Sequence, residues 1–310
     1  MFRFLFKILI TLCLIVILFN FIDKTTILNN LQSLNYFQFI SYLFLILISL
    51  FFLYLRFECL LDLGFSKKFP LNKRIDIFIT SLGLSYVPIP GAQELYKYYD
   101  ISKLSKNKEL SFYIVIIERI FGLIGNLSIL LLLIFIFFSK FIFTTYNFYL
   151  AIFCLCLMIV FFFILFYFSI KIINAFPYLS YAFHYLKLNI LNFRIFVFKI
   201  YIYSIFLQIF SIFSSFYAIS FFSSIENYLL LIFYLQIAAI IVAIPVSFFG
   251  IGLRDIVYVS IFTSQLNFNA SNVASSSTFI NFFTILTVIS SIFILLFFRK
   301  KIRSAKKGNK

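Results

Sequence analysis

Tryptophan is absent from this chain of 310 residues, and histidine occurs only once. Acidic residues number 10 against 26 lysines and arginines, and the chain contains only 8 glycines and 5 prolines. Hydrophobic residues make up 64% of the sequence and charged residues 12%, with a mean hydropathy of +1.09, which excludes a soluble domain. Apolar runs of roughly 18 residues or more recur, and each can cross a ~30 Å hydrocarbon core. The sequence therefore predicts an all-α polytopic membrane protein.

The chain also lacks the signatures of common catalytic and cofactor sites. It has no phosphate-binding loop of the G-x-x-x-x-G-K-[ST] type and no H-E-x-x-H metal motif. The cysteines show no metal-ligand spacing, and His184 has no partner motif. We expect no metal, no cofactor and no enzymatic activity. Because the basic residues cluster beside apolar runs, as the positive-inside rule requires, we also expect no nucleic-acid partner.

Six apolar segments are long enough to be full spans, namely 4–22, 37–57, 112–138, 149–168, 200–222 and 274–298. Arg3 and Lys7 place the N-terminus in the cytoplasm, and the basic tail 299–310 places the C-terminus on the same side. The 23–36 segment contains one lysine, and we expect it to be an external loop. This orientation predicts a multi-pass protein of the inner (cytoplasmic) membrane.

Two further apolar segments, 75–90 and 228–264, contain helix breaks. Proline lacks a backbone N–H and glycine permits a turn, so we expect breaks at Pro88 to Gly91 and at Pro245 to Gly252. Basic residues flank the first segment on both sides, whereas the second begins and ends on the external side. We predict two broken or re-entrant hairpins that enter from opposite faces. The alternative is that both segments are full tilted spans, which gives eight crossings.

The order of span, broken hairpin and span occurs twice within a single membrane domain of residues 1–310. The first unit covers about 37–138 and the second about 200–298, upside down relative to the first. Inverted repeats of this kind form binding sites near the bilayer midplane, where broken helices meet.

Charged residues interrupt the apolar sequence at three places. A charge at the bilayer centre costs about 2.5–3.5 kcal/mol, and Glu118 and Arg119 lie inside an apolar helix. Adjacent helical residues point in different directions, so each needs a partner from another element. We predict that Glu118 or Glu94 pairs with Arg254, and Arg119 with Asp255. The alternative is a purely structural network, with both hairpin acids simply favoured by a helix dipole.

The dipole explains the acids but not the arginines. A guanidinium near a helix N-terminus, beside glycines that expose the backbone, is suited to binding phosphate. We therefore assign Arg119 and Arg254 to an anionic lipid head group, together with the glycines Gly91, Gly250 and Gly252. The acids Glu94, Glu118 and Asp255 would balance the arginines or carry protons.

These motifs resemble the flippase-like membrane domain of the lysylphosphatidylglycerol synthase family. That family shows a break like P-G-R-x-G-E, then an E-R pair, then P-x-S-x-G-G-x-G-x-R-E late in the chain. The corresponding segments are 90–94, 118–119 and 245–255. The first break lacks the arginine and the second glycine, and Asp255 replaces the usual glutamate. A chain of 310 residues has no room for the soluble synthase domain, so the resemblance implies lipid translocation without aminoacylation.

We therefore expect a flippase-like protein that moves an anionic or modified phospholipid between leaflets, with the acyl chains left in the bilayer beside a hydrophobic groove between the units. Two alternatives stay open. One is an intramembrane transferase acting on a polyprenyl-phosphate-linked or lipid substrate, with the carboxylates as acid and base. The other is a scaffold for a separate lipid synthase.

Overall fold

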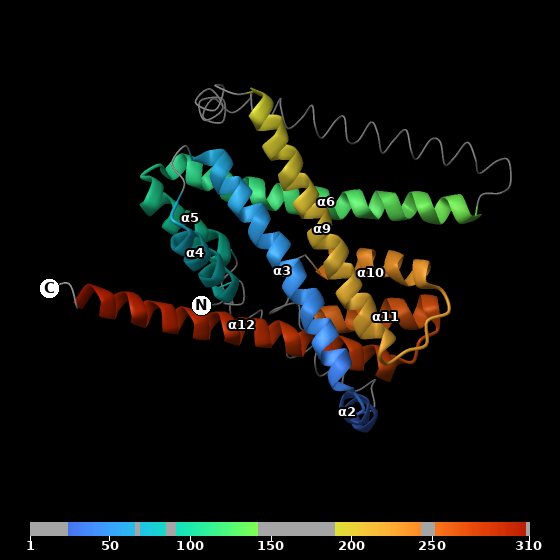
Figure 1. Cartoon of the computed structure of the whole chain (residues 1–310). Coiled ribbons are helices and arrows are strands. Elements are labelled where there is room, and N and C mark those ends of the chain that lie inside the picture. The colour runs from blue at the N-terminus through green and yellow to red at the C-terminus, as the bar shows by residue number, and fades with distance from the viewer. Residues whose placement is uncertain (1–23, 66–68, 85–90, 142–189, 243–251, 308–310) are drawn as a thin grey trace, which may run out of the picture.

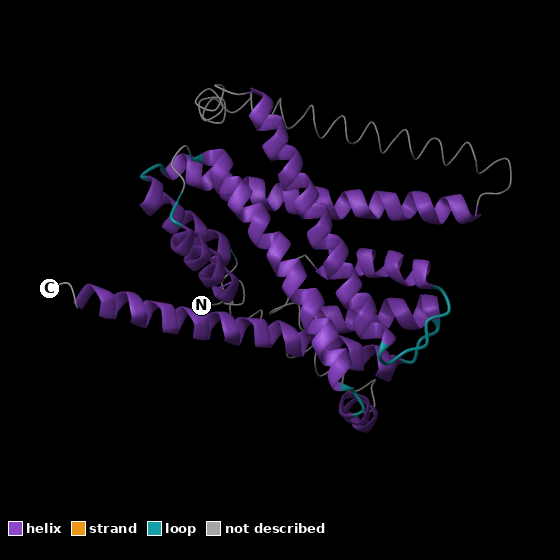
Figure 2. Cartoon of the chain, in the orientation of Figure 1, coloured by secondary structure: helices purple, strands orange, loops and turns teal. Residues whose placement is uncertain are grey.

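The computed structural model describes residues 24–65, 69–84, 91–141, 190–242 and 252–307. Every regular element in these ranges is an α-helix, and Figure 2 shows no strand among them. The predicted all-α class is confirmed for this part of the chain.

Four long helices carry most of the apolar sequence: α3 (Tyr36–Gly64), α6 (Lys108–Phe141), α9 (Ile190–Ser220) and α12 (Ala270–Lys307). Within the described residues, each contains a stretch long and apolar enough to cross a membrane. These helices confirm four of the six predicted spans as apolar helices of membrane length. The predicted spans 4–22 and 149–168 lie outside the described residues.

Two pairs of shorter helices lie where the sequence predicted breaks. The first pair is α4 (Leu71–Leu84) and α5 (Ala92–Ser105), and the second is α10 (Tyr228–Val242) and α11 (Leu253–Leu266). Helices of 14 or 15 residues are about 21–23 Å long at 1.5 Å per residue, which is less than the ~30 Å hydrocarbon core. The helices of each pair pack against each other. Length and packing agree with two hairpins, and the exact number of spans stays a prediction.

Each unit packs one arm of its hairpin on the other unit. In each unit the second hairpin arm packs on the long helix that follows it, so α5 contacts α6 and α11 contacts α12. The first arms contact the opposite unit, because α4 packs on α12 and α10 packs on α6. The helices α3 and α9 form the central contact, and the hairpins lie on opposite sides of it (Figure 1). This exchange agrees with the predicted pair of units, whose inversion stays a prediction.

A close backbone approach joins the two units at Gly125 of α6. A β-carbon added at Gly125 would lie 3.1 Å from the backbone oxygen of Ser204 on α9. Small residues allow membrane helices to approach this closely, and van der Waals packing then stabilises the contact.

The 23–36 segment is not only a loop, as we had expected. Residues Lys24–Gln32 form helix α2, which packs against α12. The Asn30 side-chain amide donates to Oδ1 of Asn272 (3.0 Å) and to Oγ of Ser275 (3.1 Å). The prediction of a loop was wrong because a segment too polar to span a membrane can still form a short helix when its amide side chains hydrogen-bond a neighbouring helix.

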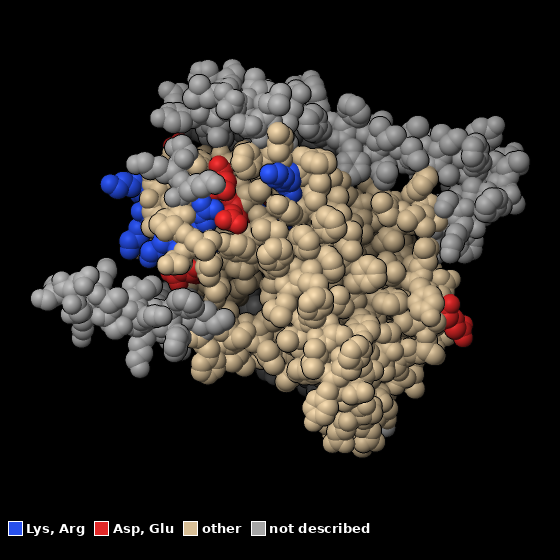
Figure 3. All heavy atoms as spheres, viewed as in Figure 1, with Lys and Arg blue, Asp and Glu red and all other residues tan. Residues whose placement is uncertain are grey.

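Basic side chains gather toward one end of the face that Figure 3 draws. Lysine and arginine lie there over α4 and α5, with a separate group near the upper part of α9, whereas the described surface of α2, α10 and α11 on this face is uncharged or acidic. An asymmetry of this kind is the pattern that sets the orientation of membrane proteins.

Cysteine labelling tests whether the short helix pairs are hairpins. In a background without the four native cysteines, Lys73→Cys and Lys103→Cys should react with an impermeant reagent from one side, because they flank the first hairpin. Glu226→Cys and Asn269→Cys flank the second and should react only from the opposite side. All four positions are exposed. Labelling in detergent provides the control for reactivity. Labelling of Lys73→Cys and Lys103→Cys from opposite sides would instead establish eight spans.

Candidate functional site

After each hairpin break the next helix begins in the same way. Gly91 precedes α5 with φ of +76°, and Gly252 precedes α11 with φ of +80°. A positive φ is readily adopted by glycine, which has no β-carbon. The third residue of each helix is an acid, Glu94 or Asp255. The local helix-start explanation therefore applies to both acids, since a negative charge in the first turn is favoured by the helix dipole.

The first break is joined to α6 by Arg119. Its guanidinium forms a salt bridge with the Glu94 carboxylate, and Nη2 donates to Oε1 of Gln93 at 3.4 Å. The Arg119 side chain is 63% exposed. We call Gln93, Glu94 and Arg119 the first module; it lies on the outer surface of α5 and α6.

The second break is joined to α12 by Asn281. Arg254 Nη1 donates to Oδ1 of Asn281 at 3.0 Å, and Asn281 Nδ2 donates to the two Asp255 oxygens at 2.9 and 3.2 Å. The backbone N–H of Gly252 also donates to Asp255 Oδ2 at 2.9 Å. Asp255 and Asn281 are buried. We call Arg254, Asp255 and Asn281 the second module.

The two modules occupy equivalent positions in their units. Counted from the helix starts, Arg119 is the twelfth residue of α6, and Asn281 is the twelfth of α12. Gln93 and Arg254 are each the second residue of a hairpin helix. The arginine and the amide have thus exchanged places between the units, while the acid keeps its position. Each module contains one guanidinium, one carboxylate and one amide.

A third cluster lies buried among α3, α5 and α6 of the first unit, beside α9 of the second. Lys97 Nζ donates to both oxygens of Glu118 at 2.7 and 2.8 Å, and Arg56 Nη2 lies 3.7 Å from Glu118 Oε1. Arg56 Nη1 also donates to Oγ of Ser204 on α9 at 3.5 Å. The Lys97 ammonium lies 4.9 Å from the centre of the Phe57 ring, a favourable cation–π position. We call Arg56, Lys97 and Glu118 the buried cluster.

The predicted pairings across the units were wrong. Glu118 and Glu94 do not contact Arg254; they pair with Lys97 and Arg119. Asp255 pairs with Asn281 instead of Arg119. The reason is that the second arm of each hairpin packs on the long helix of its own unit. The expectation that Glu118 and Arg119 diverge and take partners from other elements is confirmed.

The two arginines assigned to one head group therefore belong to different modules. They have no shared partner among the described residues. Gly250, assigned to the same site, lies outside the described residues, as does His184. Gly91 and Gly252 shape the helix starts, and no described contact shows either glycine binding a ligand.

Sequence reasoning missed Arg56 and Lys97 as site residues. Arg56 lies at the end of the apolar run 37–57, next to the basic residues that precede the first hairpin. Lys97 was treated as a topology signal, but it lies one helical turn after Glu94 on α5. An isolated charge in an apolar run was the available signal in the case of Arg56.

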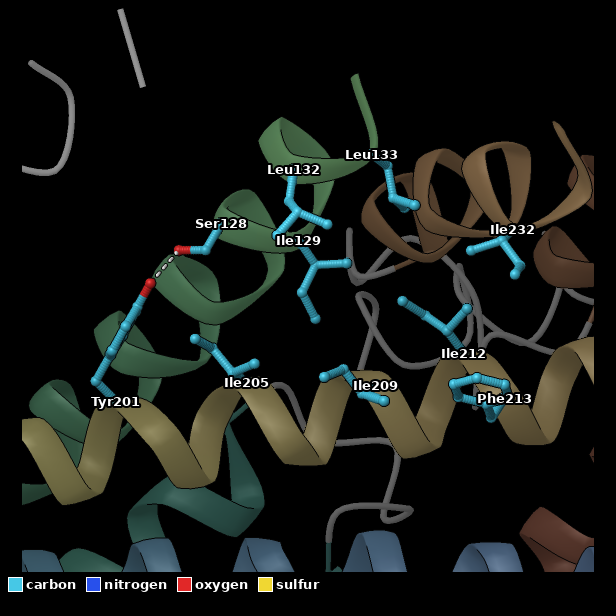
Figure 4. Close-up of a pocket in the computed structure, with 10 residues that line it drawn as sticks. All are labelled: Ser128, Ile129, Leu132, Leu133, Tyr201, Ile205, Ile209, Ile212, Phe213 and Ile232. Atoms are coloured by element: carbon cyan, nitrogen blue, oxygen red, sulfur yellow. Dashed lines mark hydrogen bonds between the residues drawn. The ribbon is translucent and has the colours of Figure 1, made fainter. Parts of the chain in front are cut away.

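The described part of the chain also has an apolar groove between α6, α9 and α10, with a volume of about 460 Å³. Figure 4 shows its ten lining residues, with the Tyr201 hydroxyl donating to Oγ of Ser128 at 3.2 Å at one end. No group of three or more potential metal ligands occurs among the described residues.

The model of a family described as the lysylphosphatidylglycerol synthase TM region matches residues 4–299. This match confirms the resemblance that the motifs indicated. Searches among curated proteins and among solved structures gave no match.

Removing the carboxylate of the buried cluster should destabilise the fold. Glu118→Gln leaves Lys97 and Arg56 buried without their counter-ion, which typically costs about 3–5 kcal/mol. Thermal unfolding of purified protein in detergent measures the loss. A second substitution, Lys97→Met, should recover part of it by removing one uncompensated cation.

The neighbouring Arg119→Gln is the matched control for this measurement. Because Arg119 is exposed, its removal should cost about 1 kcal/mol or less. Equal losses for the Glu118 and Arg119 variants would show that the ion pairs of the cluster do not stabilise the fold.

Proposed function

Since the chain belongs to the lysylphosphatidylglycerol synthase transmembrane family, we propose that it moves an anionic or modified phospholipid between the two membrane leaflets without changing it chemically. The family match covers residues 4–299, which is nearly the entire chain. The proposed location is the cytoplasmic membrane, with both termini in the cytoplasm, because Arg3 and Lys7 lie at the N-terminal end of the first apolar segment and the basic tail 299–310 follows the last one.

The proposal depends mainly on Arg254, whose positive charge has no acidic partner among the described residues. Its guanidinium is held by the amide oxygen of Asn281 and forms no salt bridge within the described residues. A half-buried guanidinium with donors remaining is suited to a phosphate, which it can bind through two parallel hydrogen bonds. A lipid phosphate would supply the negative charge that Arg254 lacks.

The first module holds its arginine differently. Arg119 is already paired with the Glu94 carboxylate, so a lipid phosphate would bind by displacing an acid of similar charge. Because Arg119 is 63% exposed, this exchange takes place where water or head groups can reach it. Displacement of an exposed pair costs little, since such pairs contribute only about 0–1 kcal/mol.

The positions of the modules fit movement between leaflets. The hairpins lie on opposite sides of the central α3–α9 contact (Figure 1), and each provides one guanidinium. A head group could therefore be bound first at one hairpin and then at the other. Transporters built from two related units use rocking of one unit against the other in this way.

Reconstitution into vesicles tests the proposal. The wild-type protein should speed the exposure of a labelled anionic phospholipid without altering its mass. Arg254→Gln should lower this rate at least about tenfold, since it removes a charge-assisted phosphate contact worth roughly 1.5–3 kcal/mol. Arg254→Lys should recover the rate only in part, because lysine cannot form the bidentate contact.

Lys108→Gln is the matched control, because it removes an exposed positive charge at the start of α6. It should leave the rate unchanged. A new lipid species by mass spectrometry would instead favour the intramembrane transferase. If neither exposure nor a new species is seen but the protein co-purifies with a lipid synthase, the scaffold is the better explanation.

A further inference from the structure

The groove between α6, α9 and α10 is apolar along most of its length. Of its ten lining residues only Ser128 and Tyr201 carry polar side-chain atoms, and Figure 4 shows both at the same end. The remainder are Ile129, Leu132, Leu133, Ile205, Ile209, Ile212, Phe213 and Ile232. A charged or strongly polar occupant would find no hydrogen-bond partner beyond the hydroxyl end, so the groove favours an apolar one.

Resting on the proposed function, we propose that this groove holds one acyl chain of an anionic phospholipid. The volume of about 460 Å³ lies in the range of about 300–1,000 Å³ found for small-molecule sites. The walls come from both units, since α6 belongs to the first and both α9 and α10 belong to the second. An acyl chain in the groove therefore contacts both units at once. An acyl chain left in the bilayer would not be held between them.

The hydroxyl end sets the direction of the lipid. The Tyr201 hydroxyl donates to Ser128 Oγ, and the Ser128 hydroxyl donates to the backbone oxygen of Ile124. This end of the groove is therefore polar, and the polar root of an acyl chain is better placed beside it than beside the hydrocarbon side chains at the other end. The apolar end, with Phe213 and Ile232, receives the rest of the chain. The head group then lies on the hydroxyl side.

The buried cluster lies on that side and has an excess of positive charge. Ser204 follows Tyr201 by three residues on α9 and accepts a hydrogen bond from Arg56. Between the groove and the cluster, α6 and α9 close on each other at Gly125 and Ser204. One turn further along α6, Gly122 leaves room for the Arg56 guanidinium, since a β-carbon there would lie 3.3 Å from Nη1.

The charge of the cluster selects the head group. Two cations, Arg56 and Lys97, face one carboxylate, Glu118. The Arg56 side chain is only 8% exposed, and its Nε has no hydrogen-bond partner within the described residues. Because an uncompensated buried cation attracts an anion strongly at low dielectric, an anionic head group is favoured over a zwitterionic one beside this end of the groove.

The absence of tryptophan from the natural sequence allows a direct test. Phe213→Trp places a single fluorophore at the apolar end of the groove. The protein is reconstituted in phosphatidylcholine vesicles that contain a minor fraction of a phospholipid brominated on its acyl chains, either phosphatidylglycerol or phosphatidylcholine. We expect quenching by brominated phosphatidylglycerol to be about fivefold more effective, as one uncompensated cation predicts.

Phe44→Trp is the matched control, because Phe44 lies on α3, is 61% exposed and does not line the groove. It should be quenched equally by both lipids. In the Phe213→Trp background, Arg56→Gln should abolish the preference and Lys108→Gln should keep it. If Arg56→Gln fails to fold, Ile209→Phe provides the second test, since a larger side chain fills the groove and should remove the preference.

Equal quenching by the two lipids at Phe213→Trp, or a preference that survives Ile209→Phe, would overturn the assignment. The measurement reads bound lipid at equilibrium and not its movement. A protein that shows the preference but exposes no lipid in vesicles would therefore contradict the proposed function alone. Movement without the preference would contradict only the acyl-chain site.

Discussion

The negative charge of a carboxylate buried in an apolar protein must be compensated by nearby positive charge, and in this chain the buried carboxylate is that of Glu118. Lys97 of the hairpin donates to both of its oxygens, and Arg56 of α3 lies beside it. Through Arg56 the cluster also reaches Ser204 of α9. Three helices of the first unit supply these charges, and Arg56 also donates to α9 of the second unit. Charge compensation in the cluster therefore also supports the contact between the units. A polar group without its partner in this environment would cost several kilocalories per mole.

The acids at the two hairpin breaks also have polar or charged partners. Each break brings an acid into the first turn of a helix, and each acid takes its partner from the long helix of its own unit. The buried cluster, in contrast, reaches across the units. A head group can therefore exchange with the partners of Arg119 or Arg254 without breaking contacts between units. This division separates the contacts that hold the molecule together from those that a ligand can replace.

Much of this architecture could be predicted from the sequence, and the failures have physical causes. Apolar run length predicted the long helices, and proline with glycine predicted both breaks. The positive φ of Gly91 and Gly252 was found only in the structure. The divergence of Glu118 and Arg119 followed from helix geometry. The pairings did not follow, because sequence order does not tell which faces of distant helices meet. Lys97 was missed because a lysine in a polar segment is indistinguishable, by sequence alone, from a topology signal.

The exchange of arginine and amide between the modules argues that the arginines are more than structural. In the second module, Asn281 and Asp255 already hold the hairpin to α12 through two hydrogen bonds. Arg254 adds a positive charge that this contact does not need. In the first module the contact itself is made by the arginine. What the units share is thus one guanidinium beside each break, whichever helix carries it. A repeated positive charge at equivalent places is what a negatively charged ligand that visits both places requires.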